Sequence, residues 1–212
     1  MNAHIDPRQR GLDAASPSAR LQAVLAIGTA ADATDLDALI ARCAVEPDFF
    51  VRDMLTWALT RLPTHAVVPR LVDEVERGTT QARSQALHTL SKIADTSTHS
   101  VVVACVTDPD DEVARAAWRA AVATVPDAGA PALGEVLVSQ LGRGDRAVQL
   151  SLSQALVALG ADVIVPLLVS RSGDPHAAAT LRLLADPAAG SQLAMEAARR
   201  EVAKGNTRNA KG

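Results

Sequence analysis

The chain has 212 residues, enough to bury a substantial core as one domain or as one continuous array of repeats. Hydrophobic residues make up 48% and aromatic residues only 2%, a composition that suits helices packed closely through small side chains. The 21 basic and 24 acidic residues give a net charge of −3. This balance argues against a nucleic-acid binder, which usually carries a basic surplus.

The sequence lacks the usual features of secretion and membrane insertion. The N-terminus has no apolar signal core, and no stretch of about 18 apolar residues is present. Cys43 and Cys105 lie far apart and outside any CxxC pair, which is typical of small buried side chains in a reducing compartment. A disulfide or a metal pair is the alternative. We therefore expect a soluble, cytoplasmic protein without a membrane partner.

A segment of about thirty residues repeats six times, and each copy opens on a residue type that caps helices. Ser, Asp and Thr side chains accept hydrogen bonds from the unpaired N–H groups of a helix N-terminus. Pro17 and Pro175 each follow such a residue, in the first helical position, where a missing N–H has no cost. The six capping residues are Ser16, Asp48, Thr79, Asp110, Asp145 and Asp174.

Each copy continues as two apolar segments separated by a turn. In the second copy, Val51, Leu55, Ala58 and Leu59 fall on one face of the first segment, which predicts a helix with one buried stripe. The second segments include "VVPRLVDEVE", "SVVVACV" and "VIVPLLVS". The copy is therefore a helical hairpin, and hairpins of this size bury their apolar faces by stacking on their neighbours.

The six hairpins predict an all-α fold with a single repeat domain over residues 15–202. The polar segment 1–14 is expected to be flexible, and the basic tail 203–212 is expected to be disordered. The ends thus contribute little to the predicted core.

Two details of the hairpins resemble the HEAT-repeat family, in particular its short bacterial members. The first helix of a hairpin opens on a D-x-x-V-R pattern at Asp48, Val51 and Arg52, and the second helix carries a proline, at Pro69 and Pro166. The resemblance covers about residues 16–202 and implies an α-solenoid of about six hairpins. It implies no particular function, because families with this fold include scaffolds, chaperone-like proteins and a few enzymes.

The first helix of the second copy contains both phenylalanines and one of the two tryptophans of the chain. Phe50, Met54 and Trp57 lie on a stripe that flanks the apolar face. Large, rigid side chains anchor protein partners, but they also fill gaps against a preceding hairpin. The sequence leaves both interpretations open. The candidate partner-binding residues on this helix are Phe50, Met54, Trp57, Arg52 and Arg61.

The second tryptophan, Trp118, stands among alanines of its own helix. A large ring beside small side chains is typical of gap filling in a close-packed interior. We therefore expect Trp118 to belong to the core.

Arginine recurs one position after the valine column, at Arg20, Arg52 and Arg83. The four-residue spacing of Asp48 and Arg52 predicts a weak ion pair worth about 0.2–0.5 kcal/mol. We interpret the column as a solvated ladder that supports the helices. A row of arginines that binds phosphates is the alternative, although interspersed acidic residues would cancel much of its field.

The second segments of the middle copies carry few charges, and residues 101–106 are apolar on every side. This pattern predicts burial between flanking hairpins. The alternative is an apolar groove or a self-association surface, which would make the protein a homodimer.

Catalytic motifs are sparse in the sequence. The five histidines form neither an HExxH nor an HxxxH pair, and no Gly-rich phosphate loop or GxSxG is present. We expect a non-enzymatic scaffold or adaptor that binds a protein or peptide, without a cofactor, a metal or nucleic acid. The resemblance leaves alternatives: a DNA-repair protein similar to HEAT-like alkylpurine DNA glycosylases, with Asp53 and Trp57 on one face, or a HEAT-type lyase or chaperone-like protein.

Overall fold

The computed structural model describes residues 7–186, and within this range every regular element is a helix. The predicted all-α fold is thus confirmed for this part of the chain. The elements are α1 (Pro7–Gly11), α2 (Pro17–Ala30), η1 (Ala33–Asp35), α3 (Leu36–Cys43), α4 (Phe49–Arg61), α5 (Thr64–Arg77), α6 (Thr80–Ile93), η2 (Thr96–Thr98), α7 (His99–Ala104), α8 (Asp111–Thr124), α9 (Ala130–Val138), α10 (Arg146–Leu159), α11 (Ala161–Val169) and α12 (Pro175–Ala185), where η denotes a short 3₁₀ helix.

All six predicted capping residues occupy the N-cap position of a helix, in α2, α4, α6, α8, α10 and α12. Five of them accept hydrogen bonds from N–H groups of the first turn, as Asp48 does from Phe50 and Val51 at 2.9 and 3.0 Å. Ser16 holds the position without such a side-chain bond. The five bonded caps therefore fix the starts of α4, α6, α8, α10 and α12.

The contacts divide the chain into two compact units, residues 1–129 and 130–212, where the sequence predicts one domain over 15–202. The boundary falls inside the longest copy, the one that begins at Asp110. The end of the predicted domain and the basic tail lie outside the described residues.

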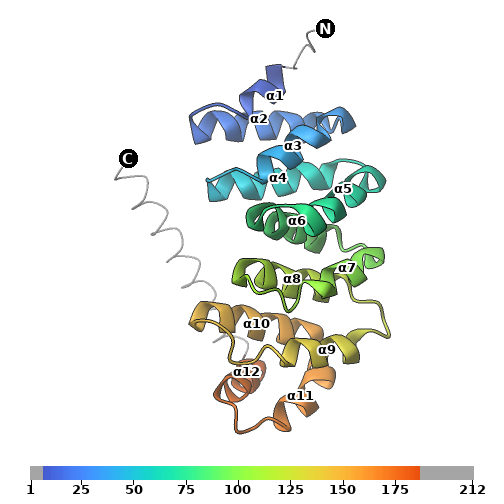
Figure 1. The fold of residues 1–212 in the computed structure, drawn as a ribbon, viewed down its shortest axis with the longest axis vertical. Helices are drawn as coiled ribbons and strands as arrows, with labels where there is room; N and C mark the ends of the chain where they lie inside the picture. Colours follow the sequence, from blue (N-terminus) through green and yellow to red (C-terminus); the bar gives the residue numbers. More distant parts are fainter. Residues whose placement is uncertain (1–6, 187–212) are drawn as a thin grey trace. The chain divides into compact units, whose positions relative to one another are not determined.

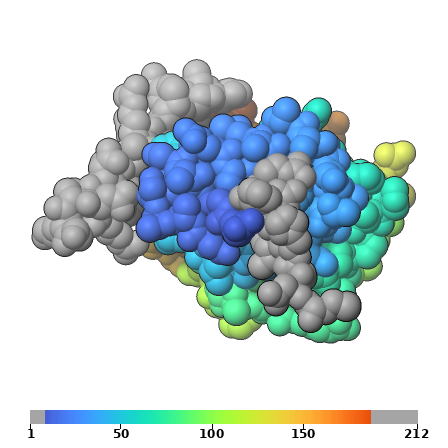
Figure 2. Space-filling model, turned by 90° about the horizontal axis from the view of Figure 1, so that it is seen from above, coloured from blue at the N-terminus to red at the C-terminus, as the bar shows by residue number. Residues whose placement is uncertain are grey.

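In the first unit the helices form two layers (Figure 1). One layer is the succession α2, α4, α6 and α8, in which each helix packs on the next. The second layer contains α3, α5 and α7, and each of these packs on the first-layer helix that follows it in the chain. Helix α1 packs on α2, so part of the segment expected to be flexible is helical and covers the end of this unit, together with α2 and α3 (Figure 2).

The core of the first unit lies between the layers and consists mainly of aliphatic side chains. The predicted stripe of α4 is confirmed, because Val51, Leu55, Ala58 and Leu59 are all buried. Helix α7 differs from the prediction, since Val102 is buried but Ala104 is exposed. Residues 101–106 thus bury one side rather than every side.

Trp118 is the largest fully buried side chain in the described part of the chain, and its assignment to the core is confirmed. Its indole Nε1–H donates to the Val106 carbonyl oxygen at 2.9 Å. The apolar surface of the indole is therefore shielded from water, and its N–H group has a hydrogen-bond acceptor.

The second unit repeats the arrangement with α9, α10, α11 and α12. Helices α10 and α12 pack together, as do α9 and α11. Helix α10 also packs on α9 and α11, and α12 packs on α11. Leu152, Leu156, Ile164 and Leu168 are fully buried and form its core.

Candidate interaction site

The turn between α3 and α4 and the first turn of α4 expose three large apolar side chains. Val45, Phe49 and Phe50 are 64%, 63% and 58% exposed, and together we call them the apolar patch. The other exposed large hydrophobic residues of the described range are single or paired on α2 and α11. Exposed apolar side chains that gather in one place mark interaction sites more often than scattered ones do.

The aromatic rings of the patch are held against each other and against a cation. The centroids of Phe49 and Phe50 lie 5.7 Å apart in an edge-to-face arrangement. The guanidinium carbon of Arg52 lies 6.0 Å from the centroid of the Phe49 ring. Contacts of this kind restrict the orientations of the two rings in the free protein.

The turn that carries the patch also contains Glu46, whose side chain is fully buried. Arg20 of α2 binds both carboxylate oxygens, through Nε at 2.8 Å and Nη2 at 2.7 Å. The Nε–H of Arg42 donates to Oε2 at 2.8 Å, and the backbone N–H of Asp48 donates to Oε1 at 2.9 Å. These four hydrogen bonds, three of them from arginines, compensate the cost of burying the carboxylate charge.

The backbone of the same turn is also bound from neighbouring helices. Gln81 of α6 donates to the carbonyl oxygens of Cys43 and Glu46 at 3.0 and 2.9 Å. Nη1 of Arg52 donates to the carbonyl oxygens of Glu46 and Pro47 at 3.0 and 2.9 Å. The turn therefore presents the apolar patch from a fixed backbone.

The environment of Glu46 favours its charged form. Burial by itself would raise the pKa of this carboxyl group, but the hydrogen bonds from Arg20, the Asp48 N–H and Arg42 outweigh burial and lower the pKa. The charged network therefore stabilises the fold above the ordinary pKa of about 4.5, and this stabilisation is lost as the pH falls through the lower value in the folded protein.

The arginine column is not a solvated ladder, and this part of the sequence interpretation is wrong. Arg20 is only 5% exposed because it reaches the buried Glu46. Arg83 similarly binds Asp108, whose side chain is 8% exposed. Asp48 caps α4 and makes no ion pair with Arg52 among the described residues. The arginines thus connect one hairpin to the turn that follows it.

The acidic partners of these arginines were missed by sequence reasoning, although the sequence contains a signal for them. Glu46 and Asp108 each stand two residues before a capping aspartate, and each accepts a hydrogen bond from the backbone N–H of that aspartate, at 2.9 and 3.0 Å. The pairing occurs in two of the copies, those that begin at Ser16 and at Thr79. A comparison of the copies position by position would have found them.

The structure separates the predicted partner-binding residues. Phe50 and Arg61 are exposed, whereas Met54 and Arg52 are half-buried. Trp57 is also half-buried, and its ring lies against Gly28 of α2, where an added Cβ atom would be 2.9 Å from the Cε3 atom of the ring. Trp57 therefore packs on the preceding hairpin, which was the second of the two interpretations.

We predict that Gly28→Ala destabilises the protein by about 1–3 kcal/mol, because the new methyl group overlaps the Trp57 ring. Urea unfolding followed by circular dichroism measures this change. In a Trp57→Leu background the same substitution should cost less, since the ring is gone. A stabilising effect, as expected for Gly→Ala in an uncrowded helix, would show that Trp57 does not pack there.

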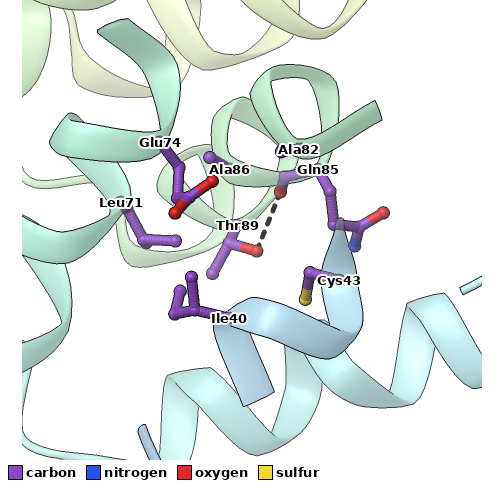
Figure 3. Close-up of a pocket in the computed structure, with 8 residues that line it drawn as sticks. All are labelled: Ile40, Cys43, Leu71, Glu74, Ala82, Gln85, Ala86 and Thr89. Carbon is purple, nitrogen blue, oxygen red and sulfur yellow. Dashed lines mark hydrogen bonds between the residues drawn. The ribbon is translucent and has the colours of Figure 1, made fainter. Parts of the chain in front are cut away.

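A small hollow opens between α3, α5 and α6, and the side chains drawn in Figure 3 converge on it. It encloses about 200 Å³, a volume that includes open solvent. Sites for small molecules typically enclose about 300–1,000 Å³. Burial and the nearby Glu74 raise the pKa of the Cys43 thiol in its wall to about 12, so this thiol is not a ready nucleophile.

In the second unit, a Ser–His pair lacks the geometry of a catalytic pair. Nδ1 of His176 accepts a hydrogen bond from the Gly142 N–H at 3.0 Å, so Nε2 carries the proton. Nε2 lies 2.9 Å from both the Ser153 Oγ and the Gln149 carbonyl oxygen. A protonated nitrogen cannot take a proton from the serine. Burial lowers the pKa of His176, which keeps the ring neutral.

No group of three or more His, Cys, Asp or Glu side chains in residues 7–186 is placed to hold a metal ion. Within the same range, every helix is too short or too polar to cross a bilayer.

The chain matches no protein-family model and no curated protein. The resemblance to HEAT repeats therefore stays a prediction.

Proposed function

We propose that the protein is a non-catalytic scaffold or adaptor that binds a protein or peptide through the apolar patch of Val45, Phe49 and Phe50. The observation that carries this proposal is the contrast between the exposed rings and the fully buried, hydrogen-bonded Glu46 in the turn that precedes them. A fixed turn that presents free aromatic side chains loses little conformational freedom on binding.

The proposed architecture is an α-solenoid of HEAT-like hairpins. The recurring N-caps, the two layers of the first unit and the same packing pattern in the second unit support it. In such arrays each hairpin contacts only its neighbours, so an exposed residue of one turn can change without loss of the core. We place the protein in the cytoplasm, in line with its two free, buried cysteines.

Selection from a displayed library of random peptides tests the function without knowledge of the natural partner. Enriched peptides should bind the purified full chain, and Phe49→Ser/Phe50→Ser should weaken binding about tenfold or more, the effect of truncating an anchor worth about 1.4 kcal/mol. Fluorescence anisotropy measures the affinities.

Val165→Ser/Val169→Ser is the matched control, because it removes two exposed apolar side chains from α11 in the second unit. The proposal is contradicted if no peptide is enriched, or if the control weakens binding as much as the change in the apolar patch does.

A further inference from the structure

The repeat allows the arginines of the first unit to be compared at one position, four residues after each capping residue. Nη1 of Arg20 donates to the carbonyl oxygens of Ala14 and Ala15, both at 2.9 Å. Its other edge, Nε and Nη2, holds the Glu46 carboxylate. One edge of the Arg20 guanidinium thus binds the backbone of the preceding turn, and the other edge binds a carboxylate.

Arg52 uses only the first of these two edges. Its Nη1 donates to the carbonyl oxygens of Glu46 and Pro47, which correspond to Ala14 and Ala15 in the repeat. Its Nε and Nη2 atoms make no hydrogen bond or ion pair with any residue that the structure describes.

The reason for the unused edge is visible in the sequence. The residue two positions before the next capping residue is Arg77, whereas the residues at this position after Arg20 and Arg83 are Glu46 and Asp108. Arg77 pairs with Asp73 of its own helix at 3.3 Å. The carboxylate that completes this site in two other places of the fold is therefore replaced by a second cation.

We propose that Arg52 binds a carboxylate of the partner, so that the partner carries an acidic group beside a large apolar side chain. This inference rests on the proposed function and names the chemistry of its ligand. The guanidinium lies beside Phe49, so one short peptide segment can place an apolar side chain on the rings and its carboxylate on Arg52. Two parallel N–H···O bonds give such a pair its strength and its direction.

Nearby acidic groups reduce the attraction but do not occupy the site. Asp48 already accepts two N–H groups of the α4 N-terminus, at 2.9 and 3.0 Å. Asp53 follows Arg52 in the sequence and is exposed, so its negative charge repels a carboxylate that approaches Arg52. A small carboxylate should therefore bind with a dissociation constant on the order of millimolar, and a peptide that also covers the apolar patch should bind more tightly.

The test is a titration of the full ¹⁵N-labelled chain with 3-phenylpropanoate, which joins an aromatic ring to a carboxylate, followed by NMR. We expect the Arg52 Nε–H signal and the amide signals of residues 48–53 to shift in a saturable way. The neutral analogue 3-phenylpropanamide should bind at least about fivefold more weakly, because it lacks the charge-assisted bonds.

Arg52→Gln removes the guanidinium with little disturbance of the turn. Gln149 holds the same position in the fifth copy and donates to the carbonyl oxygens of Gly142 and Gly144, at 3.4 and 3.2 Å. This variant should bind 3-phenylpropanoate about as weakly as the wild type binds the amide. Arg146→Gln, at the exposed first position of α10 in the second unit, is the matched control and should leave binding unchanged.

Equal binding of the two probes, equal effects of the two variants, or no shift with either probe would overturn the inference. If selected peptides still bind through Phe49 and Phe50 in that case, the proposed function stands without it. If neither peptides nor probes bind, the proposed function fails as well.

Discussion

Glu46→Ala is expected to destabilise the protein by about 3–5 kcal/mol, because the substitution leaves the buried Arg20 without its counterion. The side chain of Arg20 is 6% exposed and that of Glu46 is fully buried, so water cannot replace the lost partner. Urea unfolding at neutral pH gives the free energy. A loss below about 1 kcal/mol would mean that Arg20 finds solvent or another acceptor.

Two further variants isolate the cause of that loss. Asp108→Ala removes the equivalent acid from Arg83, whose side chain is 26% exposed, so we expect a smaller loss there. Arg20→Met/Glu46→Leu replaces the pair with apolar groups and should be more stable than Glu46→Ala alone, since no unpaired charge stays buried. If the double variant is the less stable one, packing rather than charge explains the effect.

Trp118→Ala is expected to cost about 3–5 kcal/mol, the value typical of a buried aromatic residue truncated in a core. Ala116, Ala117, Ala120 and Ala121 of the same helix are buried and too small to fill the hole. The variant also leaves the Val106 carbonyl oxygen without its indole donor. Circular dichroism during urea unfolding follows the change without relying on the fluorescence of the lost residue.

Trp57→Ala is the comparison for this experiment. Trp57 is half-buried and Trp118 is fully buried, so the same truncation removes less buried area at Trp57. The interpretation of the two tryptophans requires the larger loss at Trp118. If Trp57→Ala were the more destabilising substitution, Trp57 rather than Trp118 would be the core tryptophan.

The helix starts were predictable from the sequence because they depend on local chemistry. A capping side chain bonds to N–H groups two or three residues away, so a short window such as that after Asp48 contains the whole cause. The buried stripe of α4 was predictable for the same reason, since its period lies within one helix. Trp118 was recognisable from the alanines beside it.

The candidate site was less predictable because its causes lie in other hairpins. The packing of Trp57 depends on Gly28, which has room for a ring only because it lacks a Cβ atom. The burial of Glu46 depends on Arg20, and a lone glutamate before a proline gives no local indication of burial. The exposure of Phe49 and Phe50 depends on the fixed turn below them, so only the assembled unit shows which aromatic residues are free.

The arginine–carboxylate pairs also divide the first unit along its length. One pair joins α2 to the turn before α4, and the other joins α6 to the turn before α8, whereas Arg52 provides no such pair toward α6. Helix α4 also shares less contact with α6 than with α2. Neutral hydrogen bonds from Gln81 and Gln85 of α6 join the two blocks instead. Because neutral hydrogen bonds contribute less than charge-assisted ones, we expect the unit to open between the blocks before it opens within either of them, so that each block behaves as one cooperative foldon.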